Sequence, residues 1–346
     1  MVGTGTRQTQ RIIWLAAAIV SSVVCCGGQS THGGNGDPGD ASVPSPGPDG
    51  LSDASLPDPS LPSCSRIHEV VSIVDTFAIE DGASGFDLDG DGDIDNGFGS
   101  SESRDDINSL LAMSLEDGFR LAIELQELDD PQLLDDSRLS MVFREVEDLD
   151  CPKNPNDDFS GGEPFGFDAN DPGADGCGAI ARLTASLDSG HLGGAADALD
   201  LLFGGLGTFP LIETRFEADI VPSGLGFRIT EGRLGGIVTA CSLYEMEPVG
   251  DFSPLWLVAH YFDLQPDMDL DGDGLETITT STEKGIVERC IDPRGHDNPD
   301  PVTIEGENCA CAEGMADGYS MLLILTSVGA TLQGPLPGQP GCDTSS

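Results

Sequence analysis

Basic and aromatic residues are scarce in this chain of 346 residues. Lys and Arg together number 15 against 61 Asp and Glu, which gives a formal net charge of −46. Because binding to phosphate groups requires a basic surface, we expect no nucleic-acid partner. Aromatic residues make up 5% of the chain, whereas Gly and Pro number 46 and 23. We therefore expect a fold rich in turns.

Recognisable catalytic motifs are also missing. The sequence contains no H-E-x-x-H, no G-x-S-x-G and no phosphate-binding G-x-x-x-x-G-K-[ST] motif, and its five His residues are scattered. Two catalytic carboxylates, as in a glycosidase, would leave no local signature among so many acidic residues. The absences favour a non-enzymatic protein, with a hydrolase as the alternative.

Long apolar runs are few, and the first is too short to span a membrane. Residues 12–24 are largely apolar, a length within the ~7–15 residues of a signal-peptide core and below the ~20 of a bilayer span. Arg7 and Arg11 precede the run without any acidic residue. We expect residues 1–26 to be a targeting segment and the remainder of the chain to be soluble.

The end of this segment reads Val23-Val24-Cys25-Cys26 and resembles the lipobox of bacterial lipoproteins. In that family a small residue precedes a cysteine that is acylated and becomes the new N-terminus. The resemblance implies that Cys26 carries the lipid and that Cys25 is the small residue before the cut. It also implies an extracytoplasmic protein whose lipid anchor holds it at the outer membrane or cell surface. A cleaved signal peptide that leaves a secreted protein is the alternative.

Removal of Cys25 and acylation of Cys26 leave eight of the ten cysteines, an even number. In an oxidising compartment we expect these cysteines to form disulfides. Structural zinc is a weaker interpretation, because the one close pair, Cys309 and Cys311, is separated by a single residue and zinc sites usually have two to four. The disulfide candidates are Cys64, Cys151, Cys177, Cys241, Cys290, Cys309, Cys311 and Cys342.

Residues 27–63 consist mainly of Gly, Ser, Pro and Asp. Such a segment buries too little apolar surface to offset its ordering entropy, so we expect a disordered tether. A flexible coil of this length spans about 30–37 Å on average, enough to hold a domain away from a membrane surface. We expect residues 64–346 to form the folded extracytoplasmic region, as one unit or as two subdomains with a boundary near residues 150–180.

Apolar residues alternate with polar or small residues in several segments, which predicts β-strands. These segments are 71–79, 119–125, 139–143, 212–220 and 227–230. The apolar and small residues of 319–331 predict one or two buried strands, whereas residues 151–178 predict a long acidic loop that Cys151 and Cys177 would pin.

Two segments have helical patterns. Apolar residues recur at helical spacing over 107–115, behind candidate caps at Ser101 or Ser103, and Gly118 ends the pattern. Residues 254–262 follow the candidate cap Ser253 and begin with Pro. We therefore expect a mainly β (α+β) fold, an antiparallel sheet or β-sandwich with a few short helices and long acidic loops.

The clearest chemical signal is the segment D-L-D-G-D-G-D-I-D at residues 87–95. Calcium takes six to eight oxygen ligands, and alternate Asp residues turn their side chains onto one ion while Gly allows the tight bend. The pattern is similar to the D-x-D-x-D-G loops of EF-hands, dockerins and thrombospondin type 3 repeats. The candidate ligands are Asp87, Asp89, Asp91, Asp95 and Asp93, the last through its backbone carbonyl.

A weaker second copy begins at residue 269. Its candidate ligands are Asp269, Asp271 and Asp273, with Asp267 and Glu276 as spare carboxylates. Both loops lack the Glu of an EF-hand at position twelve, where Phe98 and Thr280 stand, and residues 96–100 oppose an exiting helix. Because the loops are far apart in the chain, we expect two separate structural calcium clips and not a paired sensor.

These patterns predict an exported, lipid-anchored, calcium-binding protein with a structural or binding role and no enzymatic activity. A surface-tethered hydrolase with structural calcium is the alternative, and a calcium-responsive switch is a third possibility. Besides the membrane, a protein or polysaccharide partner fits, but the sequence does not single one out.

Overall fold

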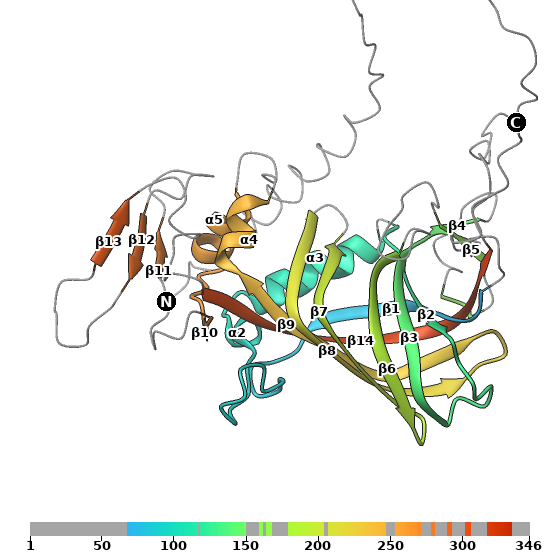
Figure 1. The fold of residues 1–346 in the computed structure, drawn as a ribbon. Coiled ribbons are helices and arrows are strands. Elements are labelled where there is room, and N and C mark those ends of the chain that lie inside the picture. The colour runs from blue at the N-terminus through green and yellow to red at the C-terminus, as the bar shows by residue number, and fades with distance from the viewer. Residues whose placement is uncertain are drawn as a thin grey trace, which may run out of the picture.

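Figure 1 shows the computed structural model, in which a long antiparallel sheet curves into a closed barrel. The structure describes residues 68–116, 118–149, 159–161, 164–167, 179–203, 207–246, 253–270, 278–280, 289–292, 302–305 and 317–333. The strands are β1 (His68–Ile79), β2 (Leu121–Gln126), β3 (Asp135–Glu145), β4 (Glu147–Asp148), β5 (Pro164–Gly166), β6 (Ala179–Asp188), β7 (His191–Phe203), β8 (Gly207–Pro222), β9 (Phe227–Thr239), β10 (Met268–Asp269), β11 (Ile278–Thr280), β12 (Arg289–Asp292), β13 (Val302–Glu305) and β14 (Asp317–Gln333). The helices are α2 (Gly97–Ser100), α3 (Arg104–Glu116), α4 (Ala240–Glu245), α5 (Pro254–Trp256) and the π-helix η1 (Leu257–Tyr261).

The barrel closes because the last long strand pairs with the first. The order is β1-β2-β3-β6-β7-β8-β9-β14, and β14 pairs on its other edge with β1. Every neighbouring pair in this ring is antiparallel. The predicted mainly antiparallel β fold is therefore confirmed. The β-sandwich alternative is wrong, because one sheet closes on itself and two sheets do not pack face to face.

Side chains of alternating strand residues fill the barrel. In β6, Ala181, Leu183 and Leu187 are buried in the main core, whereas Arg182 and Ser186 between them are exposed. Phe143 of β3 and Phe216 of β8 meet edge to face, with ring centroids 6.1 Å apart. The interior of this eight-stranded barrel is thus an apolar core made by side chains from strands distant in sequence.

A second apolar cluster covers the outer wall of the barrel where β1, β2 and β14 meet. Phe159, Phe165 and Phe167 pack there against Ala122 and Ile73, among others. β5 pairs in parallel with the end of β14 and antiparallel with β4. The segment 151–178, predicted to be a loop, therefore contains the short strand β5, because its aromatic residues pack on the apolar outer wall of the barrel.

This cover encloses an ion pair. Arg144 Nε lies 3.0 Å from Glu124 Oε2, and the two side chains are 0% and 4% exposed. Arg144 also stacks on Phe167, with 4.7 Å from its guanidinium carbon to the ring centroid. Arg120 stacks in the same way on Phe159 at 4.8 Å and donates to the Phe119 carbonyl. The outer wall of β2 and β3 thus carries charged groups that are buried only because the aromatic cover lies over them.

Both segments predicted to be helical are helical, and the structure adds the short helices α2 and α4. α3 ends at Glu116, two residues before Gly118, whose φ of +102° suits glycine. Ser253 caps α5, which continues into η1, as expected for residues 254–262. The expectation that residues 96–100 oppose a helix is wrong, since Asn96 caps the single turn α2. Of the helices in the described residues, none has the length and apolarity needed to cross a membrane.

Several expectations fall outside the described residues. These are the targeting segment 1–26 with Cys26, the tether 27–63, and most of the cysteines. Cys241 lies at the start of α4 and Cys290 lies in β12, and disulfide formation among the eight cysteines stays a prediction. The proposed subdomain boundary near 150–180 falls between β3 and β6, which are neighbours in the barrel sheet. Strands β11, β12 and β13 form a separate small antiparallel sheet.

Candidate metal centre

The first acidic loop is fastened to the outside of the barrel by apolar residues at its start. Phe86 and Leu88 are buried in a cluster with Ile237 of β9 and Leu322 of β14. The Phe86 ring lies on the backbone of Gly235, where a Cβ would come within 2.4 Å of the ring. Burial of an aromatic or Leu side chain stabilises the folded state by roughly 1.5–3 kcal/mol. These contacts therefore hold the acidic loop against β9 and β14.

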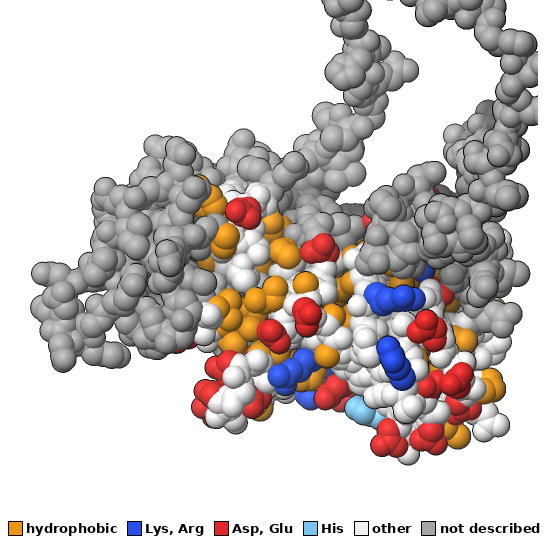
Figure 2. Space-filling view, viewed as in Figure 1, with side chains coloured by type: hydrophobic (Ala, Val, Ile, Leu, Met, Phe, Trp, Pro, Cys, Tyr) orange, Lys and Arg blue, Asp and Glu red, His pale blue; other side chains and the backbone are white. Residues whose placement is uncertain are grey.

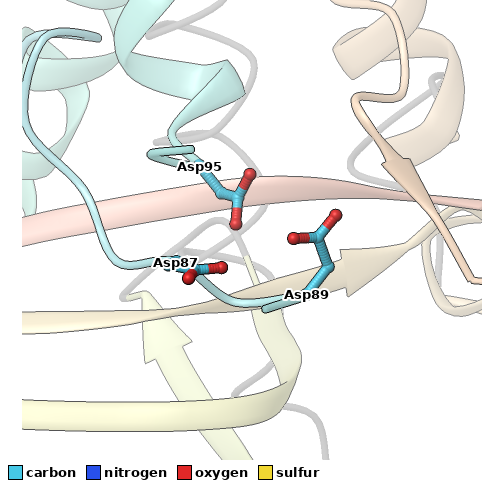
Figure 3. Close-up of side chains that lie close together, drawn as sticks. All are labelled: Asp87, Asp89 and Asp95. Carbon is cyan, nitrogen blue, oxygen red and sulfur yellow. The ribbon is translucent and has the colours of Figure 1, made fainter. Parts of the chain in front are cut away.

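Three carboxylates of this loop converge. One oxygen each from Asp87, Asp89 and Asp95 lies within 4.8 Å of the others, and Figure 3 shows the three side chains facing a common point beside β14. The ends of the loop are joined where Asp95 N donates to the Phe86 carbonyl over 2.8 Å. Three hard oxygen donors at this spacing suit a divalent cation that prefers carboxylates, of which calcium is the least demanding in geometry.

Backbone N–H groups keep the loop curled around this point. Asp87 Oδ1 accepts from Gly90 N over 2.7 Å, and Asp95 Oδ2 accepts from Leu88 N over 2.6 Å. Gly90 and Gly92 have φ angles of +84° and +96°, the left-handed region in which a Cβ is disfavoured. The two glycines at the bends were part of the sequence prediction, and the structure gives them this conformational role.

The loop exits through Asn96, a buried residue that the sequence analysis did not single out. Its Nδ2 donates to the carbonyls of Glu80, Asp81 and Ser84, and its Oδ1 accepts from Gly99 N and from Leu322 N on β14. Asn is one of the residues preferred at the N-cap of a helix, a signal that could have identified it. Asn96 therefore ties the residue after Asp95 to both the preceding loop and the barrel wall.

The predicted carboxylate ligand Asp91 lies outside the converging group, whereas the contribution of Asp93 through its backbone carbonyl stays a prediction. Asp91 and Asp93 are exposed, and Asp91 Oδ1 accepts from Asp93 N over 2.7 Å, a contact within the loop. Ile94, the apolar residue immediately before Asp95, is 56% exposed. Phe98, at position twelve where an EF-hand has Glu, is buried in the main core against Tyr319. Position twelve thus anchors the loop to the core and offers no oxygen.

The second acidic segment is described only at its start. Asp269 lies in β10 opposite Asp317 of β14, whereas Asp271 and Asp273 fall outside the described residues. Met268 belongs to the same apolar cluster as Phe86 and Leu88 of the first loop. The two acidic segments, expected to be separate, therefore begin side by side on β14. Local sequence patterns do not reveal this proximity, because the pairing of β10 with β14 joins residues far apart in the chain.

No protein-family model, curated protein or solved structure matches the chain.

Two carboxyl groups at the site have shifted pKa values. Burial raises the pKa of Asp95, and the negative charges of Asp89 and Asp91 add to the rise, against the hydrogen bond from Leu88 N. Burial also raises the pKa of Asp267, against hydrogen bonds from Ser320 and with a further rise from the charge of Asp95. Without a cation, ionisation of this site is disfavoured.

We expect the metal-free protein to gain stability as the pH falls through the raised pKa of Asp95. The folded pKa of Asp95 is above its unfolded value, so the folded state binds the extra proton and the unfolding free energy rises as pH falls through the folded pKa. Urea unfolding in chelator at several pH values measures this. Asp95→Asn is the control, because it should reduce the gain while leaving general charge repulsion intact. An equal gain in both proteins would contradict the role given to Asp95.

Proposed function

We propose that this chain is an exported, lipid-anchored protein whose β-barrel is stabilised by calcium and serves a structural or binding role outside the cytoplasm. The observation that carries the calcium proposal is the convergence of the Asp87, Asp89 and Asp95 carboxylates. A cation there would favour the ionised form of Asp95, whose pKa is raised by burial and by the nearby charges of Asp89 and Asp91. It would also tie the start and end of a loop attached to β9 and β14.

Figure 2 shows acidic side chains gathered at several places on the visible face of the barrel. With a formal net charge of −46, the folded chain repels itself unless cations neutralise part of that charge. Extracellular modules bind calcium with Kd values of about 10⁻⁴–10⁻³ M, and such weak sites are filled at extracellular concentrations. A calcium-stabilised fold is therefore consistent with export.

Titration calorimetry tests the calcium proposal. We expect the wild-type protein to bind calcium and Asp89→Asn to weaken the binding by tenfold or more, because it removes one of the three converging carboxylates. Asp219→Asn is a control of equal charge change, since Asp219 is an exposed partner of His191 away from the loop. Wild-type protein that takes up no calcium, or equal effects of both variants, would refute the proposal.

The anchor has an independent test. The intact mass of protein extracted from membranes should show acyl chains on Cys26, and Cys26→Ser should release the protein from the membrane fraction. An unmodified N-terminus in the membrane-extracted protein would refute lipid anchoring without affecting the calcium proposal.

A further inference from the structure

Ser320 and Asp267 contact Gly97, in the backbone that immediately follows the first acidic loop. Ser320 of β14 is fully buried, and its Oγ accepts from Gly97 N over 2.7 Å. The same hydroxyl donates to Asp267 Oδ2, and Ser320 N donates to Asp267 Oδ1 over 2.7 Å. The carboxylate of Asp267 thus orients the hydroxyl that holds the backbone of Gly97, two residues after Asp95.

The contacts that run from Asp267 through Ser320 to Gly97 form a relay, and direct packing of Asp267 on Gly97 reinforces it. A Cβ on Gly97 would lie 2.5 Å from Asp267 Oδ2 and 2.7 Å from Oδ1. The carboxylate therefore rests against the bare backbone of Gly97, and a side chain at this position would displace it. Together with Asn96, whose Oδ1 accepts from Leu322 N over 3.1 Å, the contact fixes the backbone that leaves Asp95 against β14.

We infer that Asp267 and Ser320 are positioning residues that hold Asp95 in place for the cation, an inference that rests on the proposed calcium function. Asp267 is not among the three carboxylates whose oxygens converge, and both of its oxygens accept hydrogen bonds from Ser320. It acts on the ion through Ser320, Gly97 and the backbone. Outer hydrogen-bond partners of this kind orient the ligands of a metal and are worth 10–100-fold in affinity.

The contact between Asp267 and Gly97 couples the second acidic segment to the first loop. Asp267 immediately precedes β10, and Asp267 N donates to Gly318 O over 3.0 Å. A cation that fixes Asp95 and Gly97 also fixes the surface on which Asp267 rests. By reciprocity, contacts that hold Asp267 raise the affinity of the loop for the cation. Calcium should therefore slow amide hydrogen exchange at Asp267 and Met268 as well as within the loop.

The test measures calcium affinity by calorimetry for the full mature chain and two variants that break the relay differently. We expect Ser320→Ala, which removes the hydroxyl, and Gly97→Ala, which displaces the carboxylate, each to weaken binding by 10–100-fold. Ser327→Ala is the matched control, since Ser327 is also buried in β14 and its Oγ accepts from a backbone N–H, that of Ile229. It should reduce metal-free thermal stability while leaving the affinity within twofold of wild type.

The outcomes separate the inference from the function on which it rests. If wild-type protein binds calcium and both relay variants keep its affinity, the positioning role is refuted and the calcium function stands. An equal loss in Ser327→Ala would also refute it, because the effect would then be one of general stability. If wild-type protein binds no calcium, the proposed function fails and the inference fails with it. Gly97→Ala keeps the test decisive if Ser320→Ala does not fold.

Discussion

Glu124→Ala is expected to destabilise the barrel by about 3–5 kcal/mol, because it removes a carboxylate that lies against a fully buried guanidinium. The guanidinium of Arg144 is fully buried and the Glu124 carboxylate is 3.0 Å away. Solvent cannot replace the lost partner while Phe167 and its neighbours cover the wall. Urea unfolding followed by circular dichroism measures the change in unfolding free energy.

Two control variants test whether the loss of stability comes from removing one charge of the buried pair. The first removes both charges, and the second removes an exposed carboxylate. The double variant Glu124→Leu with Arg144→Met removes both charges and should lie within about 2 kcal/mol of wild type, since well-packed apolar replacements of buried pairs are often neutral. Asp219→Ala removes the exposed partner of His191 and should cost less than about 1 kcal/mol. A Glu124→Ala protein as stable as Asp219→Ala would show that the pair is solvated.

Saturating calcium is expected to raise the unfolding temperature of the wild-type protein by about 5–10 °C. A ligand at 100 times its Kd stabilises the folded state by about 2.7 kcal/mol, and for a domain of this size each kcal/mol is worth about 2–4 °C. With a Kd near 10⁻⁴ M this needs about 10 mM calcium. Calorimetric melting with calcium, and again after excess chelator, measures the effect and its reversal.

The variant Asp89→Asn with Asp95→Asn removes two of the three converging carboxylates. It should melt at the same temperature with and without calcium, because no strong site is left. In metal-free buffer it should be at least as stable as the wild-type protein, since it removes a partly buried carboxylate whose ionisation is opposed by burial and by neighbouring charges. A calcium-induced rise that persists in this variant would place the stabilising ion elsewhere.

The sequence predicted the strands whose apolar residues alternate strongly and missed those that do not. β1, β2, β3 and β8 have Ile, Leu, Phe or Val on one face, so a period of two is visible in the residues themselves. β6 and β7 use Ala and Gly at many positions, and small residues give no clear periodicity. Closure of the barrel was also beyond local patterns, because it depends on β1 pairing with β14.

The acidic loop was recognisable from its spacing, whereas its setting was not. Asp at alternate positions and Gly at the bends are local features, and the structure places Asp87, Asp89 and Asp95 together. The contributions of Ser320 and Asp267 arise from contacts between segments distant in the chain. Sequence spacing therefore identifies the candidate ligands, while the fold determines which of them meet and what holds them.

The most direct test of the calcium proposal is to locate the ion. Crystals of the mature chain grown with calcium, or with terbium in its place, would reveal bound metal through its anomalous scattering. We predict a peak about 2.3–2.6 Å from carboxylate oxygens of Asp87, Asp89 and Asp95. A map with no peak at this loop in saturating calcium would contradict the proposal.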